Sequence, residues 1–261
     1  MASSFIPRSA WRRRLAYELI YLAFGFSRSG MFNVGFAPAR QGILANPAFA
    51  VRPTQIELYA QMFDQVRWDA EQWRRSDWLE LAAGCGGGLL YLHTQHAPRS
   101  GSGVELSHVA AWRARRLGLD VRQGDAARLP VESGRLDGIF CLDALGYFPP
   151  AAFTEAFRVL KPGGILLCGE SFRGNPDAAR DHYHRRAGAA GFELIGCHDA
   201  SAGVRGAVLE RSTSTLPIAF TLLPFIRDSL KEMLSHEGSR RLGQWCSGTM
   251  CFVITSFRRP D

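Results

Sequence analysis

The sequence predicts an α/β fold built on a mostly parallel sheet, and three observations support this. From residue 78 onward, short apolar runs alternate with segments of helical periodicity, the pattern of repeated strand–helix–strand units. A glycine-dense turn at residues 84–88 separates the first strand from the first helix of this series. An acidic residue, Glu105, ends the second strand. Together these features indicate a sheet that binds a ligand at the carboxyl ends of its strands.

The predicted strands lie near 78–82, 101–106, 119–123, 137–142, 164–170, 192–197 and 248–257, with helices between them. The last of these segments is apolar enough to lie inside the sheet rather than at its edge. Before the first strand, residues 54–73 show helical periodicity, with Ile56, Tyr59, Phe63 and Val66 spaced for one face. Residues 198–245 do not fit the repeat, and we expect them to form a helical cap, with a helical patch at 220–234, that shapes a pocket.

Residues 1–53 precede the repeat and are predicted to form a helical arm or lid, which leaves residues 54–261 as the main domain. Leu15, Leu19 and Leu22 fall near one face of the arm's helix, with Tyr17 and Tyr21 beside them. The helix could pack on the main domain, close over a site, or lie on a membrane surface. Its apolar stretch is too short to span a membrane, and no clear cleavage site marks a signal peptide.

Charge and cysteine usage bound the class of partner. Residues 1–40 carry five of the seven net positive charges, so the rest of the chain is close to neutral. A nucleic-acid binder would show a basic stripe across its body, so we expect no nucleic acid as a partner. The basic arm could contact acidic lipid headgroups. The six cysteines form no CxxC pair, which predicts a reducing compartment, the cytoplasm, and neither disulfides nor zinc. The pairs His93/His96 and His182/His184 lack a third ligand, so we expect no metal.

The glycine spacing indicates which ligand the turn binds. A dinucleotide fingerprint would need a third glycine where Leu89 stands. The sequence instead has Glu80, three spacers, and then Gly84, Gly86 and Gly88. This arrangement resembles the first motif of the class I S-adenosylmethionine (SAM) dependent methyltransferases, although glycine-rich turns also serve as plain chain reversals. We expect a Cβ at Gly86 to occupy space that the methionine moiety of the cofactor needs.

Glu105 follows Gly84 by 21 residues and has Leu106 beside it. A carboxylate at this strand end can accept hydrogen bonds from both ribose hydroxyls of a nucleoside held by the preceding loop. The alternative is a solvated glutamate with no ligand role. Because the spacing agrees with the loop independently, we predict that Glu105 and Leu106 bind the cofactor.

Further stretches carry the same resemblance. Residues 124–148, GDAARLPVESGRLDGIFCLDALGYF, resemble the methyltransferase stretch GDAxxLPFxxxxFDxVxCxxAL, and residues 157–170, FRVLKPGGILLCGE, resemble that family's helix, KPGG turn and fifth strand. GCGGGLLYL and the tail EGSRRLGQWCSGTMCFVITSFRR are similar to phthiotriol dimycocerosate O-methyltransferases. The resemblance implies a Rossmann-like fold of seven strands, mostly parallel with the last strand antiparallel, and SAM as cofactor. It also implies that Asp125 bonds the adenine amino group, that Ala126 supplies a backbone donor, and that Leu142 ends the fourth strand at the cofactor.

One departure from related sugar O-methyltransferases bears on catalysis. A histidine pair that often follows their fourth strand is replaced here by Gly146 and Tyr147, so no histidine base can act from that position. Glu170, which we expect to end the fifth strand facing the crevice, is the candidate general base, or else a capping or cofactor-orienting carboxylate. Aromatic side chains are expected to line an apolar acceptor pocket: Tyr147, Phe148, Phe172, Phe32 and Phe36.

These expectations combine into one predicted function. The chain would transfer a methyl group from SAM to a hydrophobic small molecule, with O-methylation of a secondary metabolite, polyketide or lipid favoured. C-methylation of an isoprenoid or aromatic ring would use the same core, with aromatic residues steadying a carbocation. A non-catalytic partner protein with the same fold is disfavoured because the cofactor motifs are intact. The sequence leaves the oligomeric state open.

Overall fold

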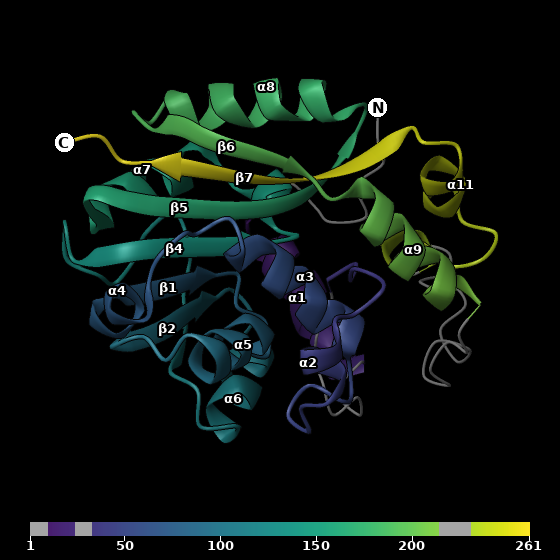
Figure 1. Ribbon diagram of the computed structural model, residues 1–261, viewed down its shortest axis with the longest axis horizontal. Coiled ribbons are helices and arrows are strands. Elements are labelled where there is room, and N and C mark those ends of the chain that lie inside the picture. Colours follow the sequence, from purple (N-terminus) through teal and green to yellow (C-terminus); the bar gives the residue numbers. More distant parts are fainter. Residues whose placement is uncertain (1–9, 24–32, 214–230) are drawn as a thin grey trace.

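A computed structural model describes residues 10–23, 33–213 and 231–261 of the protein (Figure 1). Its strands form one seven-stranded sheet in the order β3-β2-β1-β4-β5-β7-β6. All neighbouring strands pair in parallel except β7, which runs antiparallel to both β5 and β6. This confirms the prediction of a mostly parallel sheet with the last strand antiparallel. The strands are β1 (Asp77–Leu81), β2 (Ser100–Glu105), β3 (Val121–Gln123), β4 (Leu136–Leu142), β5 (Leu160–Arg173), β6 (Glu193–Asp199) and β7 (Met250–Arg258).

Strand β7 lies inside the sheet, as its apolar sequence predicts. It pairs with β5 on one side and β6 on the other, and seven consecutive residues from Cys251 to Phe257 are buried. Helix α8 (Pro176–Gly188) and helix α9 (Ser201–Ser212) both contact this strand. A strand with no free edge and both faces covered needs side chains that tolerate complete removal from water, which explains its run of Phe, Val and Ile.

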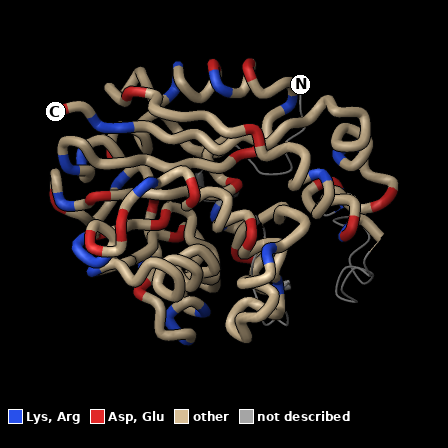
Figure 2. The backbone as a smooth tube through the Cα atoms, viewed as in Figure 1, with Lys and Arg blue, Asp and Glu red and all other residues tan. Residues whose placement is uncertain are grey.

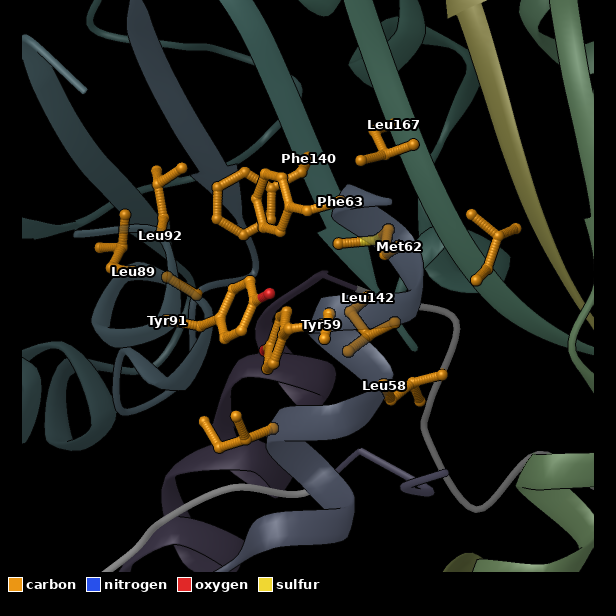
Figure 3. Close-up of a cluster of buried hydrophobic side chains, with 14 of the residues drawn as sticks. Leu58, Tyr59, Met62, Phe63, Leu89, Tyr91, Leu92, Phe140, Leu142 and Leu167 are labelled. Carbon is orange, nitrogen blue, oxygen red and sulfur yellow. The ribbon is translucent and has the colours of Figure 1, made fainter. Parts of the chain in front are cut away.

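Helices cover both faces of the sheet, and each face has its own hydrophobic cluster. One cluster joins α3 (Pro53–Phe63), α5 (Gly87–Gln95), α6 (His108–Arg116), α9 and α11 (Arg240–Cys246). The other joins α7 (Pro150–Val159) and α8 to the opposite face. Figure 3 shows the first cluster, in which Phe63 of α3 reaches Phe140 of β4, with ring centroids 5.0 Å apart. Because helices cover both faces of the sheet, a ligand can reach it at the ends of the strands.

The helix predicted over residues 54–73 is two helices. Helix α3 ends at Phe63, and α4 (Ala70–Arg75) starts after a loop, with Asp69 as its N-cap in a reciprocal capping box with Gln72. Val66 lies in the loop yet is buried. The prediction of one helix was wrong because the periodic apolar spacing continues through the loop, while the capping residue restarts the chain in a new direction.

Helix α1 (Ala10–Ala23) packs on the start of α6 through a polar residue. The Glu18 carboxylate accepts hydrogen bonds from His108 N at 2.7 Å, Val109 N at 3.1 Å and Ser107 Oγ at 2.8 Å. These contacts turn Tyr21 inward, and it is buried. Leu15, Leu19 and Leu22 point outward and are each more than half exposed, so the leucine face is not the face that packs.

Residues 33–53 are part of the core as well as of the predicted arm. Ile43 of α2 (Gln41–Leu44) and Phe49 are buried in the same cluster as α3, and Arg40 pairs with Glu57 and Asp64 of the following segment. The division at residue 53 stays a prediction. Most of the helical patch predicted at 220–234, and Phe32 of the arm, lie outside the described residues. Within the described residues, no helix has the length and apolarity needed to cross a membrane.

Candidate cofactor and acceptor site

The loop after β1 brings bare backbone to the carboxyl ends of the strands. Ala82 and Gly84 have φ of 55°, and Gly86, the N-cap of α5, has φ of 86°. Gly84 lines a pocket, and Tyr21 Oη would lie 2.9 Å from a Cβ placed there. A Cβ at Gly86 would instead lie 2.3 Å from Leu119 Cδ1. Gly86 therefore makes room for packing between the loop and the chain after α6, and the expectation that it also makes room for the methionine moiety stays a prediction.

Glu80 and Gly88 form a buried layer beneath the pocket. The Glu80 side chain accepts hydrogen bonds from Tyr59 Oη at 3.1 Å and Leu89 N at 3.1 Å, and burial raises its pKa well above the usual range. A Cβ at Gly88 would lie 2.2 Å from Glu80 Oε1, so the glycine is needed for α5 to approach β1. Neither residue lines the pocket, whereas Tyr59 does. Their binding role stays a prediction, and the contacts show that they hold Tyr59 and α5 in place.

Glu105 lies at the pocket with its carboxylate fixed by backbone donors. Oε2 accepts a hydrogen bond from Gly84 N and Oε1 accepts one from Ser107 N, both at 2.8 Å. The residue is 4% exposed, and burial raises its pKa. Each carboxylate oxygen has a further lone pair, so the group can still accept hydrogen bonds from a diol. Through the hydrogen bond from Gly84 N, Glu105 also connects the end of β2 to the glycine loop.

The predicted cofactor residues converge from four strand ends. The glycine loop follows β1, Glu105 and its neighbour follow β2, and the other two groups follow β3 and β4. The following residues among them line one pocket: Gly84, Glu105, Leu106, Asp125, Ala126 and Leu142. Asp125 Oδ1 accepts a hydrogen bond from Ala127 N at 2.9 Å, so its turn is preorganised. The sequence separates these residues by up to 58 positions, and the parallel sheet brings them to one edge.

The pocket continues toward aromatic residues after β4. Tyr147 and Phe148, predicted as acceptor contacts, line it, and Asp143 beside them has φ of 55°. The Asp143 carboxylate accepts a hydrogen bond from Val34 N at 2.8 Å, which ties the end of β4 to the predicted arm. Phe172 and Phe36 do not line this pocket. Phe172 packs on Tyr183 and His182, and Phe36 fills the space above Gly203.

Glu170 differs from the expectation in two ways. Strand β5 continues to Arg173, so Glu170 does not end it, and the residue does not line the pocket. Its carboxylate is 7% exposed and accepts hydrogen bonds from Gly146 N at 2.9 Å and Ser171 N at 3.2 Å. Burial, with Asp143 nearby, raises the pKa of Glu170 to about 8. The short helix η1 (Leu145–Tyr147) contacts the side chain through Gly146 N, and the role of Glu170 as a base facing the crevice stays a prediction.

Four of the lining residues that sequence reasoning did not assign to the site come from the chain before β1: Tyr17, Tyr21, Asn33 and Tyr59. The tyrosines of α1 come from the predicted arm, and Tyr59 comes from α3. Spacing of four residues between Tyr17 and Tyr21 indicates that they share one helix face, but it does not indicate which face is inward. The Glu18 contacts with α6 decide that.

Comparison with known proteins agrees with this geometry. The family model described as "Methyltransferase domain" matches residues 81–168. Residues 81–168 thus form a methyltransferase domain. The match and the sheet order agree with the Rossmann-like methyltransferase fold that the sequence predicts.

Two relatives that are methyltransferases by name resemble parts of this chain. A phthiotriol/phenolphthiotriol dimycocerosates methyltransferase of Mycobacterium ulcerans is 36% identical over 95 residues, 34% of this chain and 35% of the relative. A fatty-acid O-methyltransferase of Mycolicibacterium smegmatis is 28% identical over 172 residues, 64% of this chain and 58% of the relative. Among solved structures, a geranyl diphosphate C-methyltransferase from Streptomyces coelicolor A3(2) aligns with a TM-score of 0.68 at 14% identity, covering 99% and 100% of the two chains. That likeness shows the fold.

The pocket of the methyltransferase domain fits SAM in its charge as well as in its loop. Three carboxylates, those of Glu105, Asp125 and Asp143, line it, and no lysine or arginine is among its described lining residues. Four tyrosines and Phe148 complete the wall. Aromatic faces and carboxylates both attract a cation, and a sulfonium is a cation. A dinucleotide, which carries a negatively charged pyrophosphate, would be repelled by the same lining.

Proposed function

We propose that this protein is a SAM-dependent methyltransferase that methylates an oxygen of a hydrophobic small molecule, such as a lipid, polyketide or other secondary metabolite. The observation that carries the proposal is the convergence of the predicted cofactor residues on one acidic, aromatic pocket that continues to Tyr147 and Phe148. The names of the relatives in lipid methylation support the substrate class.

Each lining residue has a proposed task. Glu105 accepts hydrogen bonds from the ribose hydroxyls, while Asp125 and Ala126 bind the adenine edge and Leu142 packs on it. Gly84 brings the backbone close to the amino-acid part of the cofactor. SAM, when bound, supplies a methyl group on a positively charged sulfur. The chain's own contribution is to orient the acceptor, to exclude water with the α1 tyrosines, and to hold carboxylates near the positive charge.

Glu170 stays the proposed general base, although its carboxylate does not line the pocket. Its pKa near 8 suits proton uptake around neutral pH, but its carboxylate is bonded to backbone donors and covered by η1. A positioning role for Gly146 and Tyr147 is the alternative. Variants of Glu170 should separate these roles, because a base changes the pH profile of turnover and a positioning residue changes acceptor affinity.

C-methylation of an isoprenoid or aromatic ring is the second candidate. The aromatic wall of the pocket favours it, since tyrosine and phenylalanine faces stabilise carbocations. Analysis of the product separates the two chemistries. A methyl ester or ether supports O-methylation, and a new carbon–carbon bond supports the alternative.

The N-terminal helix supports a further part of the proposal, contact with lipid membranes. The exposed leucines at positions 15, 19 and 22 form one outward stripe, and the basic charge of the chain is concentrated in residues 1–40. A cytoplasmic location would place this helix near anionic lipid. Sedimentation with anionic and neutral vesicles tests the contact.

The main test uses the purified protein, SAM with an isotopically labelled methyl group, and a panel of acceptors. The panel contains a fatty acid, a fatty alcohol, an alkylphenol and a prenyl diphosphate, and mass spectrometry identifies the product. Calorimetric titration with S-adenosylhomocysteine measures the cofactor site independently. We expect binding of S-adenosylhomocysteine and label in an oxygen-linked methyl group. Absence of S-adenosylhomocysteine binding by the folded protein would overturn the proposal.

A further inference from the structure

Two arginines, Arg211 and Arg241, lie on helices that pack against each other, outside the lining of the cofactor pocket. Arg211 is in the last turn of α9, and Arg241 is in α11, so both come from the predicted cap. The cofactor pocket itself has three carboxylates and no basic residue among its described lining. The charged side chains that line the pocket are thus acidic, whereas Arg211 of α9 and Arg241 of α11 are basic.

Arg211 is attached to the end of β4 by a short chain of hydrogen bonds. Its Nη1 donates to Val34 O at 3.1 Å, and Val34 N donates to Asp143 Oδ2 at 2.8 Å. Asp143 lines the cofactor pocket, so Val34 alone connects the Arg211 guanidinium to a residue of the pocket lining. Arg211 Nε is buried and has no hydrogen-bond partner. Burial lowers the pKa of Arg211, which indicates that its positive charge is poorly compensated.

Arg241 shows the same property. Its Nε is also buried without a hydrogen-bond partner, and no ion pair of its guanidinium occurs among the described residues. Burial raises the pKa of both Asp143 and Glu170, and the positive charge of Arg241 partly opposes that rise. Burial likewise raises the pKa of Tyr147, and Arg241 opposes this too. Helix α11, which carries Arg241, packs against α9, which carries Arg211, so the two arginines come from neighbouring helices.

Among the described residues, neither arginine forms an ion pair with the nearby carboxylates, whose oxygens accept hydrogen bonds from other groups. Asp143 accepts hydrogen bonds from Val34 N and, at 3.4 Å, from Ser171 Oγ. Glu170 accepts from Gly146 N and Ser171 N. A half-buried guanidinium whose Nε has no hydrogen-bond partner is costly, and proteins keep such groups mainly where a ligand supplies the missing acceptor. If Asp143 is ionised, it offsets one of the two positive charges at a distance, and a monoanion would balance the other.

We propose that Arg211 and Arg241 together bind the carboxylate of the methyl acceptor, so that the acceptor is an apolar carboxylic acid. The inference rests on the proposed function and specifies its substrate class. Planar guanidinium groups match a carboxylate through paired N–H donors, and two of them can share its two oxygens. A carboxylate has already lost its proton at neutral pH. An acceptor of this kind needs no general base, which agrees with the covered position of Glu170.

The experiment measures binding of dodecanoate to the full chain saturated with S-adenosylhomocysteine, by titration calorimetry. Wild type is compared with Arg211→Gln and Arg241→Gln. Two exposed neighbours provide matched controls, Arg205→Gln on α9 and Arg240→Gln on α11. We expect each site variant to weaken dodecanoate binding about tenfold or more, through loss of charge-assisted hydrogen bonds. The controls should bind as wild type does.

Probe chemistry sharpens the result. Methyl dodecanoate, which has the same chain without the charge, should bind the wild-type protein more weakly than dodecanoate, and dodecyl phosphate should not bind more tightly. Arg241→Lys should retain part of the affinity, because it keeps the charge but not the paired donors. The inference is overturned by equal binding of dodecanoate to wild type and both Gln variants, or by a preference for dodecyl phosphate.

Failure of the inference and failure of the proposed function give different results. The titration with S-adenosylhomocysteine is done first on every variant, together with a thermal unfolding scan. Loss of S-adenosylhomocysteine binding in folded wild-type protein contradicts the proposed function. If S-adenosylhomocysteine binds normally and both Gln variants bind dodecanoate as tightly as wild type does, only the carboxylate site is contradicted.

Discussion

The two ends of the sheet use buried carboxylates in opposite ways. At the amino end, Asp77 of β1 accepts hydrogen bonds from Arg99 Nε at 2.8 Å and Ser100 Oγ at 2.7 Å, and pairs with Arg135. The Arg99 hydrogen bond holds the pKa of Asp77 far below its usual range. At the carboxyl end, Glu105 and Glu170 accept hydrogen bonds from backbone N–H groups, and burial raises their pKa values.

The difference separates a structural network from a binding site. Asp77 is buried in a network whose charges are already compensated, so a ligand has nothing to add there. The carboxylates at the other end are held in place without a cationic partner, which costs stability and leaves them able to bind one. Figure 2 shows acidic and basic residues interspersed along the described chain, so the contrast does not arise from a general separation of charge. It arises because Arg99 and Arg135 form ion pairs with Asp77, whereas no ion pair of Glu105 or Glu170 occurs among the described residues.

The largest expected effect removes the carboxylate at the binding end. Glu105→Ala should weaken S-adenosylhomocysteine binding about 100-fold, because two charge-assisted hydrogen bonds to the ribose would be lost. The free energy of unfolding should change little or increase at neutral pH, since a buried, uncompensated charge is removed. Titration calorimetry and urea denaturation measure the two quantities. Unchanged affinity in the folded variant would show that the two ends do not differ in function.

The opposite change is made at the amino end. Asp77→Asn should lower the free energy of unfolding by about 2 kcal/mol, because Arg99 and Arg135 lose a charged partner that is itself buried. Its affinity for S-adenosylhomocysteine should equal that of wild type. Urea denaturation and calorimetry provide the measurements. A loss of cofactor affinity without a loss of stability would contradict the structural assignment of this network.

The pH dependence of stability should also differ between the ends. Asp77 has a lowered pKa in the folded state, so its stabilisation is present above its unfolded pKa of about 3.9 and is lost as the pH falls below that value. Glu170 has a raised pKa, so the folded state holds its proton longer than the unfolded state. Its contribution is present below about pH 4.3 and is lost as the pH rises toward 8.

Glu170→Gln tests whether the raised pKa of Glu170 makes the stability of the protein depend on pH. The variant should be more stable than wild type at pH 8, by about 1 kcal/mol or more, and the two should converge near pH 4. Urea denaturation at several pH values measures the difference. A constant offset between the two proteins across this range would mean that Glu170 does not titrate with a raised pKa.

The smallest expected effect concerns the helix that covers the binding end. Tyr21→Ala removes a buried ring from the pocket wall, and we expect S-adenosylhomocysteine to dissociate about fivefold faster, the equivalent of roughly 1 kcal/mol. Leu19→Ala, on the exposed face of the same helix, is the matched control and should leave the rate unchanged. Stopped-flow displacement measures both. Equal rates in the two variants would argue against α1 as a cover.

Several features of this protein could be predicted from its sequence because their signals are local. Strand positions follow from short apolar runs, and the interior place of β7 follows from its unbroken apolar sequence. The convergence of Gly84, Glu105 and Asp125 on one pocket follows from a rule of parallel sheets, that the carboxyl ends of the strands meet at one edge. The placement of these residues needed no knowledge of side-chain packing.

Only the tertiary structure decided what depends on packing between distant segments. Gly86 and Gly88 look like ligand contacts in a motif, yet the space each leaves is needed by Leu119 in one case and Glu80 in the other. Glu170 looks like an open strand end, but η1 covers it. The inward face of α1 was set by a carboxylate that caps another helix. Arg211 donates to Val34, which in turn donates to Asp143 at the end of β4, across 177 positions of sequence between Arg211 and Val34. Periodicity and spacing describe one element at a time, whereas these features are contacts between elements.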